Sequence, residues 1–384
     1  MNLHVQVALC ILTAHQIINR EVGVEVMSSK IHSVVIVGFG GMGSYHAKLI
    51  KETNSLEVVG TYDLLEARRA DSINAGYKVY ESYEEVLVDP AVEIVLIATP
   101  NDVHKEIAIR ALQAGKHVIC EKPVAMSKEE LQDMLDAADA AGRVFMVHQN
   151  RRWDEDFLTI KKMYDQETIG SLFQLESRVH GANGIPGDWR HVKAQGGGML
   201  LDWGVHLLDQ LLFMIDSKVI SVSSSLSFIL GNDVDDGFEA ILQFENGIKA
   251  IVEVGTTNFI TLPRWYVKGI EGTGIIEDWS LTGRLVTRNN EGEKIEPKPI
   301  RAGVGLTKTM APPSEGATIT EALPQPAELG SSFYDNFAAV IEGTAEPIVK
   351  NAEVMRVQNL IEAIFESAEK NQVVKDFDMY GEGK

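Results

Sequence analysis

The chain has 384 residues, of which 45% are hydrophobic, and a formal net charge of −20 at pH 7. This length favours two domains, and the hydrophobic share is large enough for two cores. So negative a charge argues against nucleic acids and anionic membranes as partners, because both attract a basic protein surface. The only cysteines are Cys10 and Cys120, without metal-ligand spacing, which is typical of a protein of the reducing cytoplasm.

Residues 1–29 precede the first predicted strand and form a separate extension. The run from Val5 to Leu12 has the length of a signal-peptide core, but it lacks the basic segment and the cleavage position of a signal peptide. No stretch approaches the ~18 apolar residues of a membrane span. Because Met27 stands just before the first strand, we interpret residues 1–26 as the product of an upstream start codon or as a dispensable extension.

A glycine-rich turn follows the strand predicted at 33–37, and it reads G-x-G-x-x-G. In such a turn the first glycine allows a tight bend, the second lets the backbone approach a pyrophosphate, and the third lets the next helix pack on the strand. By itself the motif also fits a glycine turn without a ligand. The predicted dinucleotide-binding residues of this turn are Gly38, Phe39, Gly40, Gly41, Met42 and Gly43.

A carboxylate in the expected place supports the dinucleotide. The second predicted strand, 57–62, is followed by Asp63, which stands 20 residues after Gly43, where the motif has a carboxylate for two ribose hydroxyls. Such a carboxylate repels the 2′-phosphate of NADP, so NAD is the predicted cofactor. NADP remains the alternative, because Arg68 and Arg69 follow closely and a basic group near the ribose can bind that phosphate.

Residues 30–150 alternate short apolar runs with helix-like segments, which is the pattern of a parallel, doubly wound α/β sheet. A helix is predicted over 127–141, where Ser127 and Glu130 form a capping box. The strands are expected at 33–37, 57–62, 78–80, 92–98, 117–120 and 144–148.

Two of the predicted strands end in polar turns, and ligands of such sheets bind at the carboxyl ends of the strands. The residues of these turns that are predicted to contact the dinucleotide are Thr99, Pro100, Asn101, His104, Glu121 and Lys122. The alternative for both turns is that their polar residues only stabilise the turn, and for His104 this alternative is the more ordinary one.

Residues 151–384 follow a different rhythm, which predicts a second domain with an antiparallel sheet. Asn246-Gly247 is a hairpin signal between two alternating segments, one of whose faces is apolar. The Pro-rich region 289–326 is an irregular excursion, and two closing helices are expected near 330–342 and 351–370. The strands are expected at 171–180, 219–230, 238–245, 248–256, 264–270, 275–277 and 283–288.

A glycine-rich entry at 196–198 leads into a helix that is apolar nearly all round and therefore buried. Asp202 and His206 lie four residues apart on it, within reach of each other on one face. Burial of two ionisable groups requires that they are paired or used. A structural His–Asp hydrogen bond is one reading, and a metal site is disfavoured because no further ligand cluster is evident.

Taken together in this order, the motifs resemble the glucose–fructose oxidoreductase/inositol dehydrogenase family of NAD(P)-dependent enzymes. They are G-x-G-x-x-G, Thr99-Pro100 with His104, Glu121-Lys122-Pro123, Trp189-Arg190 and G-G-x-x-x-D-x-G-x-H, which ends at His206. The resemblance runs from about Lys30 to Val374 and leaves out 1–26 and much of 300–328. It implies a nucleotide-binding domain joined to an open-faced, mainly antiparallel α/β domain.

The resemblance also implies the site residues. Lys122, Asp202 and His206 correspond to the catalytic group of the family. Residues near the expected substrate are Lys122, Arg152, Trp189, Arg190, Asp202 and His206, with Arg151, Trp153, Arg178 and His191 as further pocket candidates.

The chemistry of alcohol oxidation gives each catalytic residue a role. A histidine of pKa near ~6.5 is suited to accepting the hydroxyl proton, so His206 is the expected general base. Asp202 would fix the tautomer of that imidazole, and Lys122 would stabilise the developing alkoxide. The nicotinamide would take the hydride.

The expected function is oxidation of a secondary hydroxyl of a sugar, glycoside or cyclic polyol such as inositol. A glycoside 3-oxidase or a redox-neutral, NAD-dependent glycosidase is the alternative within enzymology. A sugar- or dinucleotide-sensing regulator is the alternative from another class, although a sensor has no need of a proton acceptor. The resemblance further implies a homodimer or homotetramer, formed through the exposed face of the large sheet, where Ile241 and Ile251 interrupt polar residues.

Overall fold

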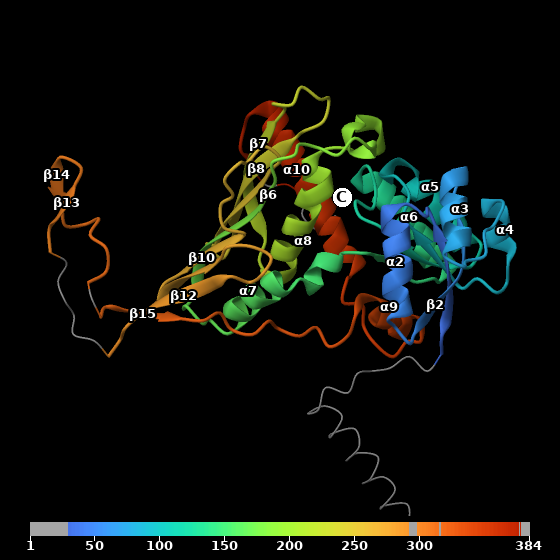
Figure 1. Cartoon of the computed structure of the whole chain (residues 1–384), viewed down its shortest axis with the longest axis horizontal. Coiled ribbons are helices and arrows are strands. Elements are labelled where there is room, and N and C mark those ends of the chain that lie inside the picture. The colour runs from blue at the N-terminus through green and yellow to red at the C-terminus, as the bar shows by residue number, and fades with distance from the viewer. Residues whose placement is uncertain (1–29, 292–297, 315, 376, 378–384) are drawn as a thin grey trace, which may run out of the picture.

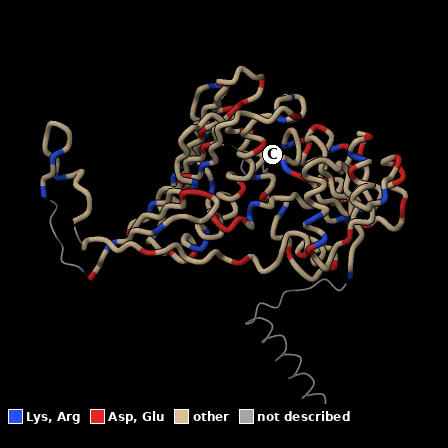
Figure 2. The backbone as a smooth tube through the Cα atoms, in the orientation of Figure 1, with Lys and Arg blue, Asp and Glu red and all other residues tan. Residues whose placement is uncertain are grey.

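The computed structural model describes residues 30–291, 298–314, 316–375 and 377, which form two adjoining α/β domains (Figure 1). The expectation for residues 1–26 concerns residues outside those ranges. Acidic residues are distributed along the backbone of both domains (Figure 2). Within the described ranges, none of the helices combines the length and the apolar character that a membrane crossing demands.

The first domain contains a five-stranded parallel sheet with the strand order β2-β1-β3-β4-β5. Five of the six predicted strands are confirmed, and only the segment 78–80 is reduced to an isolated bridge between Thr61 and Val79. The strands are β1 His32–Val37, β2 Leu56–Tyr62, β3 Ile94–Ile97, β4 His117–Cys120 and β5 Phe145–Val147.

Helices cover the parallel sheet on both faces, as its central strand β3, which is buried at every residue, requires. The predicted capping box is confirmed, because the Ser127 hydroxyl accepts a hydrogen bond from the Glu130 N–H at the start of α6. The helices are α2 Gly41–Lys51, α3 Glu66–Asn74, α4 Tyr83–Val88, α5 His104–Gln113 and α6 Lys128–Ala141.

The second domain contains a nine-stranded sheet with the order β15-β12-β11-β10-β6-β9-β8-β7-β16. Every pairing is antiparallel except the one between β6 and β9, so the sheet is mainly antiparallel, as expected. Its strands are β6 Leu172–His180, β7 Val219–Ser227, β8 Gly237–Phe244, β9 Lys249–Gly255, β10 Trp265–Gly269, β11 Gly272–Ile276, β12 Gly283–Arg288, β15 Thr318–Glu321 and β16 Val374–Lys375.

One face of this sheet is covered by α7 (Glu155–Asp165), α8 (Val205–Met214) and α10 (Asn351–Lys370), which lie between the sheet and the first domain (Figure 1). The alternation predicted around Asn246-Gly247 is confirmed: inward residues of β8 are buried, and Gly247 takes the positive φ of +92° that the turn needs.

The chain then returns to the first domain. Helix α9 (Phe333–Ile341) packs its aromatic side chains into the core of the parallel sheet, although it lies late in the sequence. Between β12 and β15, in the predicted excursion, a separate two-stranded sheet forms from β13 (Ile300–Ala302) and β14 (Gly305–Thr307).

Candidate active site

The glycine turn between β1 and α2 is shaped by close backbone contacts. Gly38 has a φ of +93°, and a Cβ there would lie 2.6 Å from the Ala98 carbonyl oxygen. At Gly43 a Cβ would lie 2.0 Å from the Gly38 carbonyl oxygen. By contrast, a Cβ at Gly40 or Gly41 would meet nothing within 4 Å. The outer glycines are thus required by the fold, whereas the middle pair leaves open space over the backbone where a pyrophosphate can approach.

Asp63 is fixed beside this turn. Its Oδ2 accepts a hydrogen bond from the Phe39 N–H at 2.7 Å, and its Oδ1 accepts one from the Leu65 N–H at 2.8 Å. Each oxygen of an ionised carboxylate accepts more than one hydrogen bond, so both retain capacity for a ribose hydroxyl. The carboxylate therefore fits the predicted role.

The two arginines after Asp63 point to different places. Arg69 donates hydrogen bonds to the carbonyl oxygens of Asp63 and Leu64, at 3.0 and 2.8 Å, and so braces the loop. Arg68 lines a pocket of about 450 Å³ between α2 and α3, together with Phe39 and other residues of both helices. Only Arg68 is therefore placed to meet a group bound near the glycine turn.

The turn after β3 is held by its histidine. His104 is fully buried, and its ring nitrogens lie 2.9 Å from the Thr99 carbonyl oxygen and 3.0 Å from the Pro123 carbonyl oxygen. Burial lowers the pKa of this imidazole, although those backbone contacts oppose the shift. The ring of His104 is not exposed and ties the two polar turns together, so the contact of this residue with the cofactor stays a prediction.

Asn101 also holds two segments together. It is buried, and its Nδ2 donates to the Gly196 carbonyl oxygen at 3.1 Å. Thr99 and Pro100, in contrast, are partly exposed at the end of β3. They keep their predicted place at the carboxyl edge of the parallel sheet.

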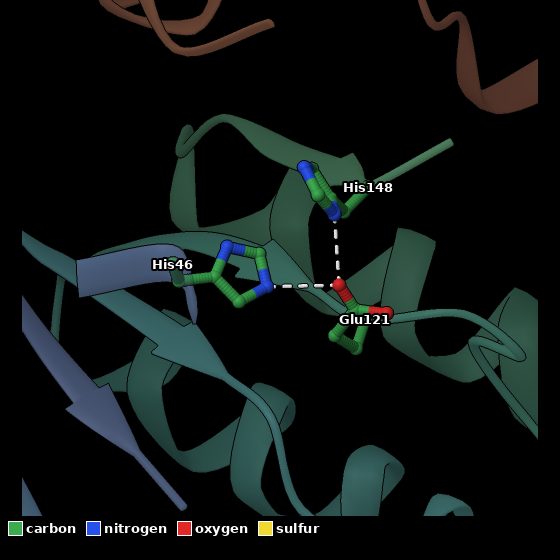
Figure 3. A group of neighbouring side chains, drawn as sticks. All are labelled: His46, Glu121 and His148. Atoms are coloured by element: carbon green, nitrogen blue, oxygen red, sulfur yellow. Dashed lines mark hydrogen bonds and ion pairs between the residues drawn. The ribbon is translucent and has the colours of Figure 1, made fainter. Parts of the chain in front are cut away.

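Glu121 belongs to a buried group that we call the His–Glu–His cluster, formed by His46, Glu121 and His148 (Figure 3). Nε2 of His46 and Nδ1 of His148 each lie 2.8 Å from the same Glu121 oxygen, Oε1. The Tyr334 hydroxyl, on α9, lies 2.8 Å from Nδ1 of His46. The cluster thereby joins α2, the β4 end, the β5 end and α9.

The electrostatics of the His–Glu–His cluster favour a charged glutamate. Burial would raise the pKa of Glu121, but hydrogen bonds and charges from His148 and His46 outweigh it and hold the pKa well below its usual range. The other oxygen, Oε2, accepts the Lys122 N–H at 3.1 Å. The Glu121 carboxylate therefore faces the protein interior, and the contact of this residue with the cofactor stays a prediction.

The three side chains could also serve as metal ligands, since their ligand atoms lie within 4.8 Å of one another, and no other such group occurs among the described residues. In this geometry both imidazoles are hydrogen-bonded to Glu121 at ordinary distances, which accounts for the group without an ion. Sequence analysis missed His46 and His148, because their positions along the chain show no recognisable ligand spacing.

Lys122 lies across the domain junction from Asp202, and with Arg190 they form what we call the Lys–Asp–Arg cluster. Nζ of Lys122 is 3.1 Å from the Asp202 carbonyl oxygen and 3.4 Å from Oδ1, while Nε of Arg190 donates to Oδ2 at 2.9 Å. Burial would raise the pKa of Asp202, but Lys122 and Arg190 lower it below the usual value. The aspartate is therefore ionised and neutralised by two cations.

The expected hydrogen bond between Asp202 and His206 is wrong, because the Asp202 carboxylate is directed to the two cations instead. Leu200–Gly204 forms a π-helical turn ahead of α8, and residues four apart do not align across a turn that closes at i+5. The pattern in the sequence assumed ordinary α-helical spacing. Its two residues share the site without bonding to each other.

His206 is nearly buried, and its Nδ1 has no hydrogen-bond partner among the described residues. Burial, followed by the positive charges of Lys122 and Arg151, lowers its pKa well below the ordinary histidine value. The imidazole is thus neutral at pH 7 and has a nitrogen that the protein does not use. These are the properties of a proton acceptor.

An aromatic wall stands beside His206. The Trp203 ring lies 6.0 Å from that of His206 and 6.0 Å from that of Trp279, which projects from the β11–β12 turn. Arg151 lies over both indoles, with its guanidinium carbon 4.2 and 5.4 Å from the ring centroids. Sequence analysis missed both tryptophans, since Trp203 occupies an unspecified position of the G-G-x-x-x-D-x-G-x-H motif, Trp279 lies in no motif, and the two meet only through the fold.

Arg152, a predicted substrate ligand, lies in the protein interior, so its contact with substrate stays a prediction. Its side chain is fully buried and forms paired hydrogen bonds to Asp209, at 2.7 and 2.8 Å, with a third to Glu353 at 2.6 Å. Its charge is satisfied inside the protein, where it joins the segment after β5 to α8 and α10. Its neighbour Arg151 is the arginine that reaches the site.

Trp189 and Arg190 are half-buried and lie next to each other, with the guanidinium 4.6 Å from the indole ring. Other pocket candidates lie elsewhere: Arg178 pairs with Glu253 on the open sheet, and the Trp153 indole donates to the Ser331 carbonyl oxygen. The site thus takes its polar groups from both domains.

The fold agrees with that of a known protein family. Residues 32–149 match the model of an oxidoreductase family with an NAD-binding Rossmann fold, and residues 157–274 match the C-terminal domain of the same GFO/IDH/MocA family. A crystal structure of an NAD-binding protein from Listeria innocua is 63% identical, with a TM-score of 0.89, and the match covers 90% of this chain and all of that one.

Named enzymes are more distant. The scyllo-inositol 2-dehydrogenase (NADP(+)) of Bacillus subtilis is 28% identical over 361 residues, which cover 89% of this chain and 95% of that enzyme. The 1,5-anhydro-D-fructose reductase of Ensifer adhaerens is 32% identical over 225 residues, covering 56% and 67% of the two chains. The chain therefore belongs to the GFO/IDH/MocA family and is an NAD(P)-dependent oxidoreductase acting on CH–OH groups.

Proposed function

We propose that this enzyme oxidises a secondary hydroxyl of a sugar, glycoside or inositol-like polyol with NAD, and that His206 accepts the hydroxyl proton. The observation that supports this most is the nearly buried imidazole of His206, which lies beside Lys122 and Arg151 and whose pKa is lowered well below its ordinary value. A neutral imidazole of this kind takes up a proton at neutral pH, whereas a protonated one cannot.

Lys122 is the second group of the proposed mechanism. Its ammonium has three N–H donors, and the two acceptors it meets among the described residues both belong to Asp202. A donor is left for the substrate oxygen, whose negative charge grows as the hydroxyl proton leaves for His206. The Asp202 carboxylate, itself held by Arg190, keeps the ammonium in place. When bound, the nicotinamide supplies the acceptor for the hydride that leaves the same carbon.

The residues at the glycine turn fit a dinucleotide. The open backbone at Gly40 and Gly41 suits a pyrophosphate, and both Asp63 oxygens retain capacity for ribose hydroxyls. We propose NAD as the preferred form because of that carboxylate, although the relative from Bacillus subtilis uses NADP according to its name. Arg68, which lines the adjacent pocket, is the group that would favour a 2′-phosphate.

The substrate class is proposed from the walls of the site. Arg151 stacked between Trp203 and Trp279 offers both hydrogen-bond donors and aromatic faces, which suits the hydroxyls and C–H faces of a sugar ring. Trp279 is about half exposed. This leaves one side of the site open, as a glycoside or other extended substrate would require.

The test is to incubate the pure protein with NAD or NADP and a panel of inositols, hexoses and glycosides while following the absorbance of the reduced cofactor. The proposal expects reduction with at least one secondary alcohol. Dinucleotide binding without turnover of any substrate would favour the sensing regulator, and release of an aglycone without net reduction would favour the redox-neutral glycosidase.

We also propose a homodimer or homotetramer that works in the cytoplasm. The exposed face of the large sheet carries large apolar side chains, among them Phe173, Ile220 and Ile241, and a patch of this kind is stabilised by a partner. Cys120, the free cysteine of the described residues, is buried, in keeping with a reducing compartment. Light scattering at micromolar concentration tests the assembly, and a monomer mass would exclude it.

A further inference from the structure

Residues 298–314, which we call the arm, extend from the edge of the large sheet, far from the first domain (Figure 1). They contain the hairpin β13–β14, whose strands pair with each other and with no other strand of the described chain. A lone two-stranded hairpin is at best marginally stable in water. The hairpin therefore lacks, among the described residues, a further strand that would hold it.

The arm exposes large apolar side chains to solvent. Val304, between the strands, is fully exposed, and Leu306 and Met310 are each 77% exposed. Single exposed apolar residues are common, but three of them gathered on one short projection are typical of a protein contact surface. The arm thus has the composition of an interface without a covering partner.

The charge of the arm is opposite to that of the chain. Between residues 298 and 314 the sequence has Lys298, Arg301 and Lys308 and neither Asp nor Glu, although the whole chain carries a net charge of −20. The positive residues of the arm stand apart from the rest of the molecule in Figure 2. A surface that complements the arm is therefore acidic and partly apolar.

The arm is directed away from its own active site. The β11–β12 turn, which carries Trp279, contacts Trp203 at the site, and the six residues of β12, Gly283–Arg288, then lead away from it. At about 3.3 Å per residue, this strand puts the base of the arm roughly 20 Å further from the site. The arm is therefore remote from the active site of its own subunit.

We propose that the arm binds a second copy of this chain, on the exposed face of the nine-stranded sheet. That face offers the apolar side chains of Phe173, Ile220 and Ile241, and Glu239 stands exposed beside Ile241 on β8. The partner subunit is acidic overall and present at the same concentration as the arm. Two copies that exchange arms in this way bury both apolar surfaces. The inference builds on the proposed assembly and adds the segment that holds it.

The first experiment changes the arm and measures mass by sedimentation velocity at micromolar concentration. Val304→Asp combined with Leu306→Asp places two charges on the apolar tip, where no core is disturbed. We expect the dissociation constant of the assembly to rise by at least about tenfold, which corresponds to ~1.4 kcal/mol. Ile73→Asp with Val88→Asp, two exposed residues of the first domain, is the matched control and should leave the mass unchanged.

The second experiment locates the contact. A Val304→Cys variant carrying a short photo-crosslinker is mixed with isotopically heavy chain, and adducts are mapped by mass spectrometry. The proposal expects light–heavy adducts between position 304 and strands of the exposed sheet face. Adducts confined to one chain, or an arm that binds anionic vesicles without forming light–heavy adducts, would overturn it.

The two proposals on assembly can fail separately. If the aspartate variant keeps the wild-type mass and dissociation constant, the arm proposal is wrong while assembly through the sheet face stands. If the wild type is a monomer at micromolar concentration, both are wrong. Turnover measured on the same samples shows that the variants remain folded, because neither substitution touches the active site.

Discussion

Two ionic clusters meet at the Glu121–Lys122 turn, and they differ in how completely their polar atoms are satisfied. In the His–Glu–His cluster each contact is a short, buried hydrogen bond within the protein. The Lys–Asp–Arg cluster stands at the domain junction, next to His206 with its unpartnered nitrogen. The comparison teaches that the consecutive residues Glu121 and Lys122 differ in role. The His–Glu–His cluster, whose hydrogen bonds are made within the protein, fixes the turn, whereas the Lys–Asp–Arg cluster lies beside a polar atom without a partner, as a site that binds a reacting molecule requires.

Removing the ammonium from the second cluster should have the largest effect. Lys122→Ala should lower kcat by roughly 10²–10⁴-fold, the range for loss of a positioned electrostatic group. Its stability should change little, since the site is partly exposed. The measurements are steady-state kinetics and a thermal melt, with the exposed Lys128→Ala as the matched control. A Lys122→Ala enzyme with near-normal turnover would remove this residue from the mechanism.

Glu121→Gln tests the His–Glu–His cluster and should have the opposite effect to Lys122→Ala: it should lower stability more than turnover. The amide keeps the shape but loses the charge that accepts hydrogen bonds from His46 and His148, so the free energy of unfolding should fall by about 1.5–3 kcal/mol. Urea unfolding measures it. A loss of turnover larger than that of Lys122→Ala, without loss of stability, would contradict the division between the clusters.

The same variant carries a pH signature. Because the folded-state pKa of Glu121 lies below its ordinary value of 4.5, its ionised form stabilises the fold above that pH, and this contribution is lost as pH falls through the lowered pKa. Wild-type stability should therefore drop more steeply than that of Glu121→Gln on going below pH 4.5. Parallel stability curves for the two proteins would show that the charge of Glu121 is not stabilising.

Asp202→Asn should have an intermediate effect. The amide can still accept a hydrogen bond, but Lys122 and Arg190 lose the charge that holds them, and a misplaced ammonium costs up to about 10²-fold in rate. Since Asp202 does not bond to His206, the pH at which activity falls on the acid side should remain that of the wild type. If the pH of this acid-side decline shifts in Asp202→Asn, the direct Asp202–His206 hydrogen bond expected from the sequence would be supported instead.

The first domain could be predicted almost completely from the sequence, because its signals are local. The glycine turn, the capping box at Ser127 and the uniformly apolar strands depend on neighbouring residues, and the structure confirms them. The hairpin at Asn246-Gly247 was predictable for the same reason.

The errors concern contacts between distant segments or a change of helical geometry. The π-helical turn at Leu200–Gly204 leaves no mark in the residue pattern, so the four-residue spacing was misread. Arg152 became a buried anchor only because Asp209 and Glu353 converge on it from two other helices. The sequence pointed to ionisable residues of the site but could not assign their partners.

The smallest expected effect concerns the cofactor. Asp63→Ser removes the charge opposed to a 2′-phosphate and one acceptor of ribose hydroxyls, so NAD should bind about tenfold more weakly and NADP more tightly. Arg68→Ala should then cancel the gain for NADP. The preference is measured as the dissociation constants of NAD and NADP from fluorescence titration. A wild-type protein that prefers NADP would show that Asp63 does not decide between the two cofactors.

The pH dependence of kcat/KM tests most directly the central claim that His206 is the proton acceptor. The pKa of this histidine is lowered well below its ordinary value of 6.5 by burial and by Lys122 and Arg151. Oxidation by the wild type should therefore stay constant as pH falls past 6.5 and decline only at lower pH, where the ring becomes protonated. In a folded His206→Gln variant the rate should be lower and this limb should disappear. An unchanged limb in His206→Gln, or a wild-type decline that begins above pH 6.5, would contradict the account.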